Sequence, residues 1–190
     1  MVKALEDLRH EHRLIERVLA VLERVTQQLE CGDAVSPDTL AQALVFVRGF
    51  ADGCHHAKEE QGLFPVLAAK SPTIEGGPVK VLSADHEAGR KLMRDLERGI
   101  EAMRAGKPEG REEARKALTT YTHMLHRHIA KEEEILFPLS EGLLTDEEAK
   151  QLDAHFERVE EQAGAGAHER YEALVDEMEV ATSIAAAHAH

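Results

Sequence analysis

The chain has 190 residues with a formal net charge of −13, which argues against nucleic acid or an anionic membrane surface as its main partner. No apolar run approaches the roughly 18 residues of a membrane span and no signal-peptide core opens the chain, so we expect a soluble, cytoplasmic protein. Charged residues make up 31% of the chain and Gly and Pro are sparse, which favours an all-α fold. The two cysteines are too few for a disulfide framework.

Two helices are predicted in the first part of the chain. Residues 2–30 carry apolar side chains at alternating spacings of three and four, and the helix-ending residue Gly32 follows. A second helix over residues 37–69 begins with Ser36 as the cap and proline at its first position. Three aromatic side chains fall opposite its main apolar face: Phe46, Phe50 and Phe64. We expect the C-terminal segment or a partner subunit to cover them, and a homodimer would satisfy the second alternative.

The second part of the chain predicts further helices. Gly76-Gly77-Pro78 precedes a third helix that ends at Gly106, and a fourth follows over residues 108–140. The capping pair Thr145 and Glu148 begins a fifth helix, and a weaker one follows a Gly-Ala-Gly break. We expect the small-residue tail over 181–190 to fray.

An eleven-residue stretch occurs twice and organises the rest of the chain. Residues 55–65 read HHAKEEQGLFP and residues 128–138 read HIAKEEEILFP. Since His12 and His86 are separated by nearly the same interval as the two stretches, each half contains one His on its first helix and a His–Glu pair on its second. The repeat predicts an up-down-up-down four-helix bundle over residues 1–141, with residues 142–190 as a helical extension packed on the bundle or at a subunit interface.

The repeat brings six polar side chains to one depth of such a bundle. Positions i and i+4 share a helix face, and the rise of about 1.5 Å per residue puts both halves at the same level. These side chains are His12, His55, Glu59, His86, His128 and Glu132. Burying carboxylates without partners is costly, so a metal centre is favoured, with a buried hydrogen-bonded network as the alternative. The only other charge expected nearby is Arg48.

Imidazole and carboxylate donors suit Fe, Mn or Zn. Two facing glutamates can bridge two ions, and an oxo or hydroxo bridge would still leave coordination positions open. We therefore expect a small ligand such as dioxygen, nitric oxide or peroxide.

The same motifs closely resemble hemerythrin-like domains of the HHE cation-binding type. The resemblance spans roughly residues 1–140 and rests on Glu11-His12, Asp85-His86 and the two His-x-x-x-Glu motifs, each followed by Leu-Phe-Pro. It implies two Fe ions, held by the four His and bridged by Glu59 and Glu132. Oxygen carriers of the wider family use a fifth His where this chain has Arg90, which favours sensing, nitric oxide or peroxide chemistry over simple oxygen carriage.

Three functions follow as alternatives. The first is a binding or sensing module, and the second is a di-iron enzyme that consumes peroxide or nitric oxide. The third is iron storage or delivery, which ranks last because ferritin-like sites use Glu-x-x-His rather than the order found here.

Four further residues lie outside the set of six. His56 and Glu60 also form an i, i+4 pair and could replace or supplement the inner pair, although they point about 100° away on a regular helix. Tyr121 could donate a hydrogen bond near the metals or simply be a core aromatic. Cys54 is expected to be a small buried hydrophobe.

Overall fold

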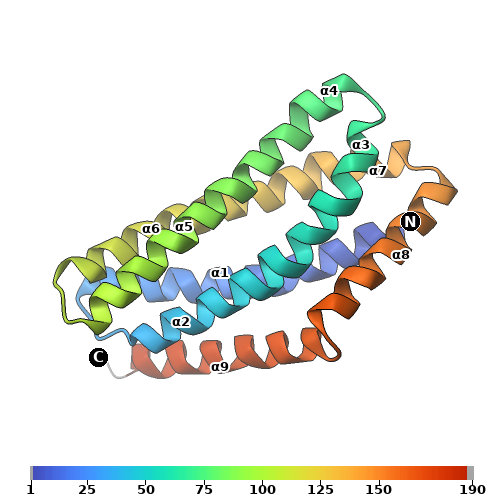
Figure 1. Cartoon of the computed structure of the whole chain (residues 1–190). Helices are drawn as coiled ribbons and strands as arrows, with labels where there is room; N and C mark the ends of the chain where they lie inside the picture. The colour runs from blue at the N-terminus through green and yellow to red at the C-terminus, as the bar shows by residue number, and fades with distance from the viewer. Residues whose placement is uncertain (1, 188–190) are drawn as a thin grey trace.

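The computed structural model describes residues 2–187, and every regular element within that range is a helix (Figure 1). The first helix is α1 (Lys3–Cys31). The remaining elements follow in chain order: α2 (Pro37–Phe46), η1 (Val47–His56), η2 (Glu59–Leu63), α3 (Phe64–Ala68), α4 (Pro72–Ile74), η3 (Glu75–Val79), α5 (Lys80–Arg104), α6 (Glu109–Lys131), η4 (Glu132–Leu136), α7 (Phe137–Leu143), α8 (Asp146–Ala163) and α9 (Ala167–Ala187). The elements η1, η2 and η4 are π-type turns, in which hydrogen bonds run from i to i+5, whereas η3 contains a kink at Gly77, with φ −103° and ψ −107°.

Three of the predicted helix boundaries are present, whereas helix already begins at Pro72, before the predicted start after Pro78. Gly32 ends α1 in the left-handed region at φ 87°, which glycine adopts without steric cost. The Ser36 side chain accepts a hydrogen bond from the backbone of Asp38 at the start of α2. Thr145 and Glu148 form a complete capping box at the start of α8.

Four rods run up, down, up and down, as predicted. They are α1, the run from α2 to α3, the run from α4 to α5, and the run from α6 to α7 (Figure 1). The second and fourth rods change from α-helical to π-type hydrogen bonding where each eleven-residue stretch lies.

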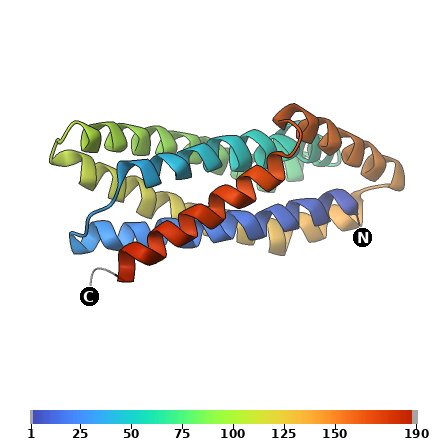
Figure 2. The ribbon, with the colours of Figure 1, turned by 90° about the horizontal axis from the view of Figure 1, so that it is seen from below.

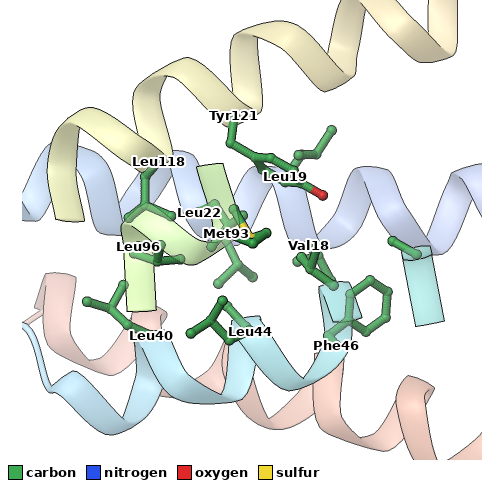
Figure 3. Packing of buried hydrophobic residues seen from close by; sticks show 14 of the residues in the cluster. Val18, Leu19, Leu22, Leu40, Leu44, Phe46, Met93, Leu96, Leu118 and Tyr121 are labelled. Carbon is green, nitrogen blue, oxygen red and sulfur yellow. The ribbon is translucent and has the colours of Figure 1, made fainter. Parts of the chain in front are cut away.

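Two apolar clusters fill the bundle, and the polar residues lie between them. One cluster occupies the half that contains the α5–α6 connection, and Figure 3 shows Leu22, Leu96 and Leu118 meeting there. The other occupies the opposite half and includes Leu8, Leu63 and residues of α8. Along α1, His12 falls between Leu8 of one cluster and Leu14 of the other.

The C-terminal helices lie across the first two rods. α8 packs on α1, η1 and η2, and α9 crosses α1 and α2 (Figure 2). Tyr171 of α9 meets Phe46 edge to face at 5.9 Å and Phe50 at 5.5 Å, so the C-terminal segment covers these two rings, one of the two predicted arrangements. Phe64 instead stacks on His86 inside the bundle, at 5.6 Å. A Cβ at Gly49 would lie 1.9 Å from the Tyr171 hydroxyl, so this close approach requires glycine. α9 continues to Ala187 through the stretch expected to fray, and residues 188–190 lie outside the described range.

Among the described helices, none combines the length and apolar character needed to cross a bilayer.

Candidate metal centre

Five imidazoles and two carboxylates meet in the layer between the apolar clusters. They form two adjoining groups, and within each group one donor atom per residue lies within 4.8 Å of the others. The larger group contains His56, Glu59, His86 and His128, and the smaller contains His12, His55 and Glu132. All seven side chains are buried, and the two carboxylates are completely so.

The structure brings together all six residues that the sequence singled out and adds His56. A π-type turn places more residues in each turn than an α-helix, so the neighbours His55 and His56 diverge less than the about 100° of a regular helix. Both rings therefore reach the same layer. Glu60, the other half of the alternative pair, stays outside both groups.

The inner face of the layer is formed by Nε2 atoms and glutamate oxygens. Glu132 lies 3.1 Å from His12 Nε2 and 3.0 Å from His128 Nε2. Glu59 Oε2 lies 3.4 Å from His86 Nε2 and 3.9 Å from His55 Nε2. Each glutamate thus faces one imidazole from each half of the chain.

The outer nitrogen of each imidazole faces a second carboxylate. His12 Nδ1 lies 2.8 Å from Glu133, His55 Nδ1 2.9 Å from Glu11, and His86 Nδ1 2.7 Å from Glu60. His56 Nδ1 lies 3.3 Å from Asp52, and Asp85 approaches His128 Nδ1 at 3.5 Å without a direct hydrogen bond. An ionised carboxylate only accepts, so Nδ1–H donates to it and Nε2 keeps its lone pair for an inner partner.

Cationic side chains hold these outer carboxylates in place. Arg90 binds both Asp52 and Glu60, at 2.7 and 2.9 Å. The remaining pairs are Lys58 with Glu11, Lys131 with Asp85, and Arg9 with Glu133. Arg90 thus orients two imidazoles from outside. Sequence reasoning considered Glu60 only as an alternative ligand and did not predict the pairing of the outer carboxylates with imidazoles, although Lys-Glu-Glu recurs in both stretches.

The charges of the inner layer are strongly coupled. Burial alone would lower the pKa of His12, but the hydrogen bonds with Glu132 and Glu133 outweigh it and raise that pKa to about 9. For His128 the charge of Glu132 likewise outweighs burial and raises the pKa to about 10. His56 behaves oppositely, because burial lowers its pKa to about 3. In the metal-free layer, Glu132 and its neighbouring carboxylates therefore favour the protonated forms of His12 and His128.

Glu59 is less satisfied than Glu132, whose Oε2 pairs with His12 Nε2 while its Oε1 has no hydrogen bond among the described residues. Neither oxygen of Glu59 accepts a hydrogen bond in the described part of the chain, although the side chain is fully buried. Buried carboxylate oxygens without partners are rare in native proteins and imply an ion or water that completes them. Because imidazole nitrogens surround Glu59, the donor set fits a transition-metal cation.

Sequence comparison agrees with this geometry. The family description "Hemerythrin HHE cation binding domain" matches residues 3–140. The chain belongs to the hemerythrin HHE cation-binding family. The match covers the four rods, and α8 and α9 lie beyond it.

Curated relatives of this HHE protein occur in mycobacteria. Uncharacterised proteins of Mycobacterium tuberculosis and Mycobacterium bovis are each 27% identical to it over 158 residues, which is 82% of the chain. The chain spans 60% of the length of these relatives. No solved structure matches it.

A cavity adjoins the larger group of the HHE domain. It has a volume of about 280 Å³ and is lined by the rings of His56, His86 and His128 together with Tyr121. The Tyr121 hydroxyl is buried and has no hydrogen-bond partner within the described range. Arg48, the charge expected near the layer, lines the same cavity and is paired with Glu97 at 2.6 Å.

Proposed function

We propose that this protein binds two metal ions, as a non-haem di-iron protein, and that it binds or senses a small molecule at them. The observation that carries the proposal is Glu59, a fully buried carboxylate whose two oxygens accept no hydrogen bond from any described residue and lie among imidazole nitrogens. A pair of cations between Glu59 and Glu132 would satisfy both carboxylates.

The proposed donors divide unevenly between the two ions. His56, His86 and His128 would hold one ion, His12 and His55 the other, and Glu59 and Glu132 would bridge them. Iron would supply reversible electron transfer and coordination positions for dioxygen, nitric oxide or peroxide, and Mn or Zn could occupy the same donors. Five imidazoles and two carboxylates do not fill two octahedral coordination shells, so positions remain for an exogenous ligand.

The cavity supports a small-molecule ligand in particular. It leads to the imidazoles of the larger group, and much of its lining is apolar, including Val47, Met93 and Leu125. Tyr121 also lines the cavity, and its hydroxyl, which has no acceptor among the described residues, could donate a hydrogen bond to a guest. A diatomic molecule or peroxide is thus a better match than nucleic acid or a membrane, which a chain of net charge −13 disfavours.

Metal analysis combined with an optical spectrum of the purified protein tests the proposal. We expect about two irons per chain and a charge-transfer band of a bridged pair. Less than one metal per chain after anaerobic reconstitution with Fe²⁺ would contradict it.

The second candidate is a di-iron enzyme that reduces peroxide or nitric oxide. The cavity beside the larger group favours it, since peroxide or nitric oxide could reach the imidazoles of that group through it. Spectra that interconvert with added dioxygen but show no turnover would select binding or sensing. Steady-state consumption of peroxide or nitric oxide, lost in His55→Ala, would select the enzyme.

A further inference from the structure

We propose that the C-terminal helices tune the metal position of His12 and His55, and that Glu160 of α8 is the positioning residue through which they act. This inference rests on the proposed function above. Both helices lie beyond the residues matched by the HHE family. The proposed tuning therefore depends on the C-terminal extension and not on the four-helix bundle alone.

The residue that links α8 to the metal layer is Lys58, which directly precedes Glu59 in the chain. Its side chain is completely buried, and its Nζ lies 2.5 Å from Glu11 and 2.6 Å from Glu160. The ring of Phe156, also from α8, lies 5.5 Å from the same ammonium group. One buried cation is therefore shared between a carboxylate of the bundle and a carboxylate of the C-terminal extension.

Glu11 connects this cation to the metal layer. Its Oε1 faces Lys58, and its Oε2 accepts the hydrogen bond from His55 Nδ1 at 2.9 Å. A continuous chain of charged hydrogen bonds thus runs from Glu160 through Lys58 and Glu11 to His55. In a buried network of this kind each bond polarises the next.

The second half of the protein has the same chain without its last member. Lys131 contacts Asp85 at 2.5 Å, and Asp85 approaches His128 Nδ1 at 3.5 Å. Lys131 remains 31% exposed, and no second carboxylate contacts it among the described residues. The tighter, buried chain on the His55 side therefore depends on α8.

Only the first of the two eleven-residue stretches has a glycine at the position where α8 packs. A Cβ at Gly62 would lie 2.8 Å from the His155 ring and 3.2 Å from the Phe156 ring, so glycine lets α8 approach. The equivalent position in the second stretch is Ile135, which is 56% exposed. This difference brings Glu160 to Lys58 and leaves Lys131 open to solvent.

The donor strength of His55 depends on how strongly Lys58 interacts with Glu11 and with Glu160. With Glu160 present, Glu11 keeps much of its charge for His55, which makes His55 Nε2 a stronger donor to a metal. Without Glu160, Lys58 would draw on Glu11 alone, and His55 would become a weaker donor. The metal of His12 and His55 should then bind less tightly and be reduced more easily.

The same region could be interpreted as a third metal site, because Glu11, Cys54 and His168 also approach one another within 4.8 Å. Lys58 already supplies a cation to Glu11 there. This ion pair favours the positioning role.

Anaerobic titration of the metal-free full-length chain with Fe²⁺ tests the proposal, with Glu160→Gln as the variant. We expect the affinity for one of two ions to fall a few-fold, less than the about tenfold that removal of a direct outer partner of a metal ligand costs. The midpoint potential should become more positive. The matched control is Glu161→Gln, on an exposed neighbour in α8 with no side-chain partner in the described structure, which should leave both ions unchanged.

Adding Lys58→Met completes a double-mutant cycle. If Glu160 acts through Lys58, Glu160→Gln has no further effect on metal affinity in that background, whereas independent effects would add and overturn the chain as drawn. Glu160→Gln with wild-type affinities and potential overturns the inference alone. A wild-type chain that binds no second iron overturns the proposed function and this inference together.

Discussion

The imidazole of His56 stacks on that of His86, with ring centroids 3.8 Å apart and an interplanar angle of 17°. His56 comes from the π-type turn of the second rod and His86 from the third, so the stack joins the two halves of the repeat. The position equivalent to His56 in the second stretch is Ile129, a buried aliphatic residue. This one difference makes a duplicated scaffold hold an uneven pair of donor groups.

We predict that His56→Ile, which makes the two stretches alike at this position, lowers the affinity for one of the two metal ions about tenfold or more. The affinity for the other ion should not change. The variant removes one imidazole from the larger group but none from the smaller. Iron content after dialysis against a chelator measures the effect. His123→Ala is the control, because His123 is exposed and lies outside both groups. Two firmly held ions in the His56 variant would exclude His56 as a ligand.

Arg90 carries a second prediction. It binds Asp52 and Glu60, which in turn face His56 and His86. Arg90→Met should free both carboxylates and reduce affinity for the ion of the larger group by about tenfold. Because Glu160→Gln should weaken the opposite ion, the two variants together distinguish the two positions by titration. Equal losses at both positions would indicate a general loosening of the bundle instead.

Much of the centre could be predicted from the sequence because α-helical spacing is regular. The seams of α1 and α5 each contain one His, and His55, Glu59, His128 and Glu132 repeat at a constant interval, which sufficed to bring six residues to one layer. His56 could not be placed in this way, since the direction of its side chain depends on the local change to π-type hydrogen bonding. The doublet His55-His56 was the available signal.

The outer carboxylates were less accessible to sequence reasoning. Glu60 and Glu133 are adjacent to inner glutamates in the chain, yet each contacts an imidazole from another rod. Such pairings depend on how the rods rotate against one another, which local spacing does not determine. Arg90 was expected only to be unable to bind a metal, and its role as the clamp of Asp52 and Glu60 required the packed structure.

Tyr121 provides a prediction that separates stability from ligand binding. A buried hydroxyl without a partner costs roughly 1–3 kcal/mol, so Tyr121→Phe should leave the metal-free protein as stable or more stable. Chemical denaturation measures this directly. In the iron-loaded protein the same variant should release nitric oxide faster, because the guest loses its hydrogen-bond donor. A variant that is clearly less stable would show that the hydroxyl supports the fold rather than the cavity.

Acid should unfold the metal-free protein over a broad range. Burial alone would raise the pKa of Glu11, but His55 and Lys58 outweigh it and lower that pKa to about 2; for Glu60, His86 and Arg90 do the same. A lowered folded pKa stabilises above the ordinary value of 4.5, and this contribution is lost as the pH falls toward 2. His56, with its pKa lowered to about 3, adds a loss that begins near 6.5. Thermal denaturation between pH 7 and pH 3 measures the decline, and an unchanged midpoint down to pH 4 would contradict it.

At alkaline pH the thermal stability of the metal-free protein should differ from that of the metal-bound protein. The pKa values of His12 and His128, about 9 and about 10, exceed the ordinary 6.5, so their contribution is complete below 6.5 and is lost as the pH rises through 9 to 10. Cations would replace these protons, so metal binding should release protons and tighten as the pH rises from 7 to 9. We expect the thermal midpoint of the metal-free protein to fall above pH 9 while that of the zinc-loaded protein stays level. Parallel curves for the two forms would mean that zinc does not bind at His12 and His128.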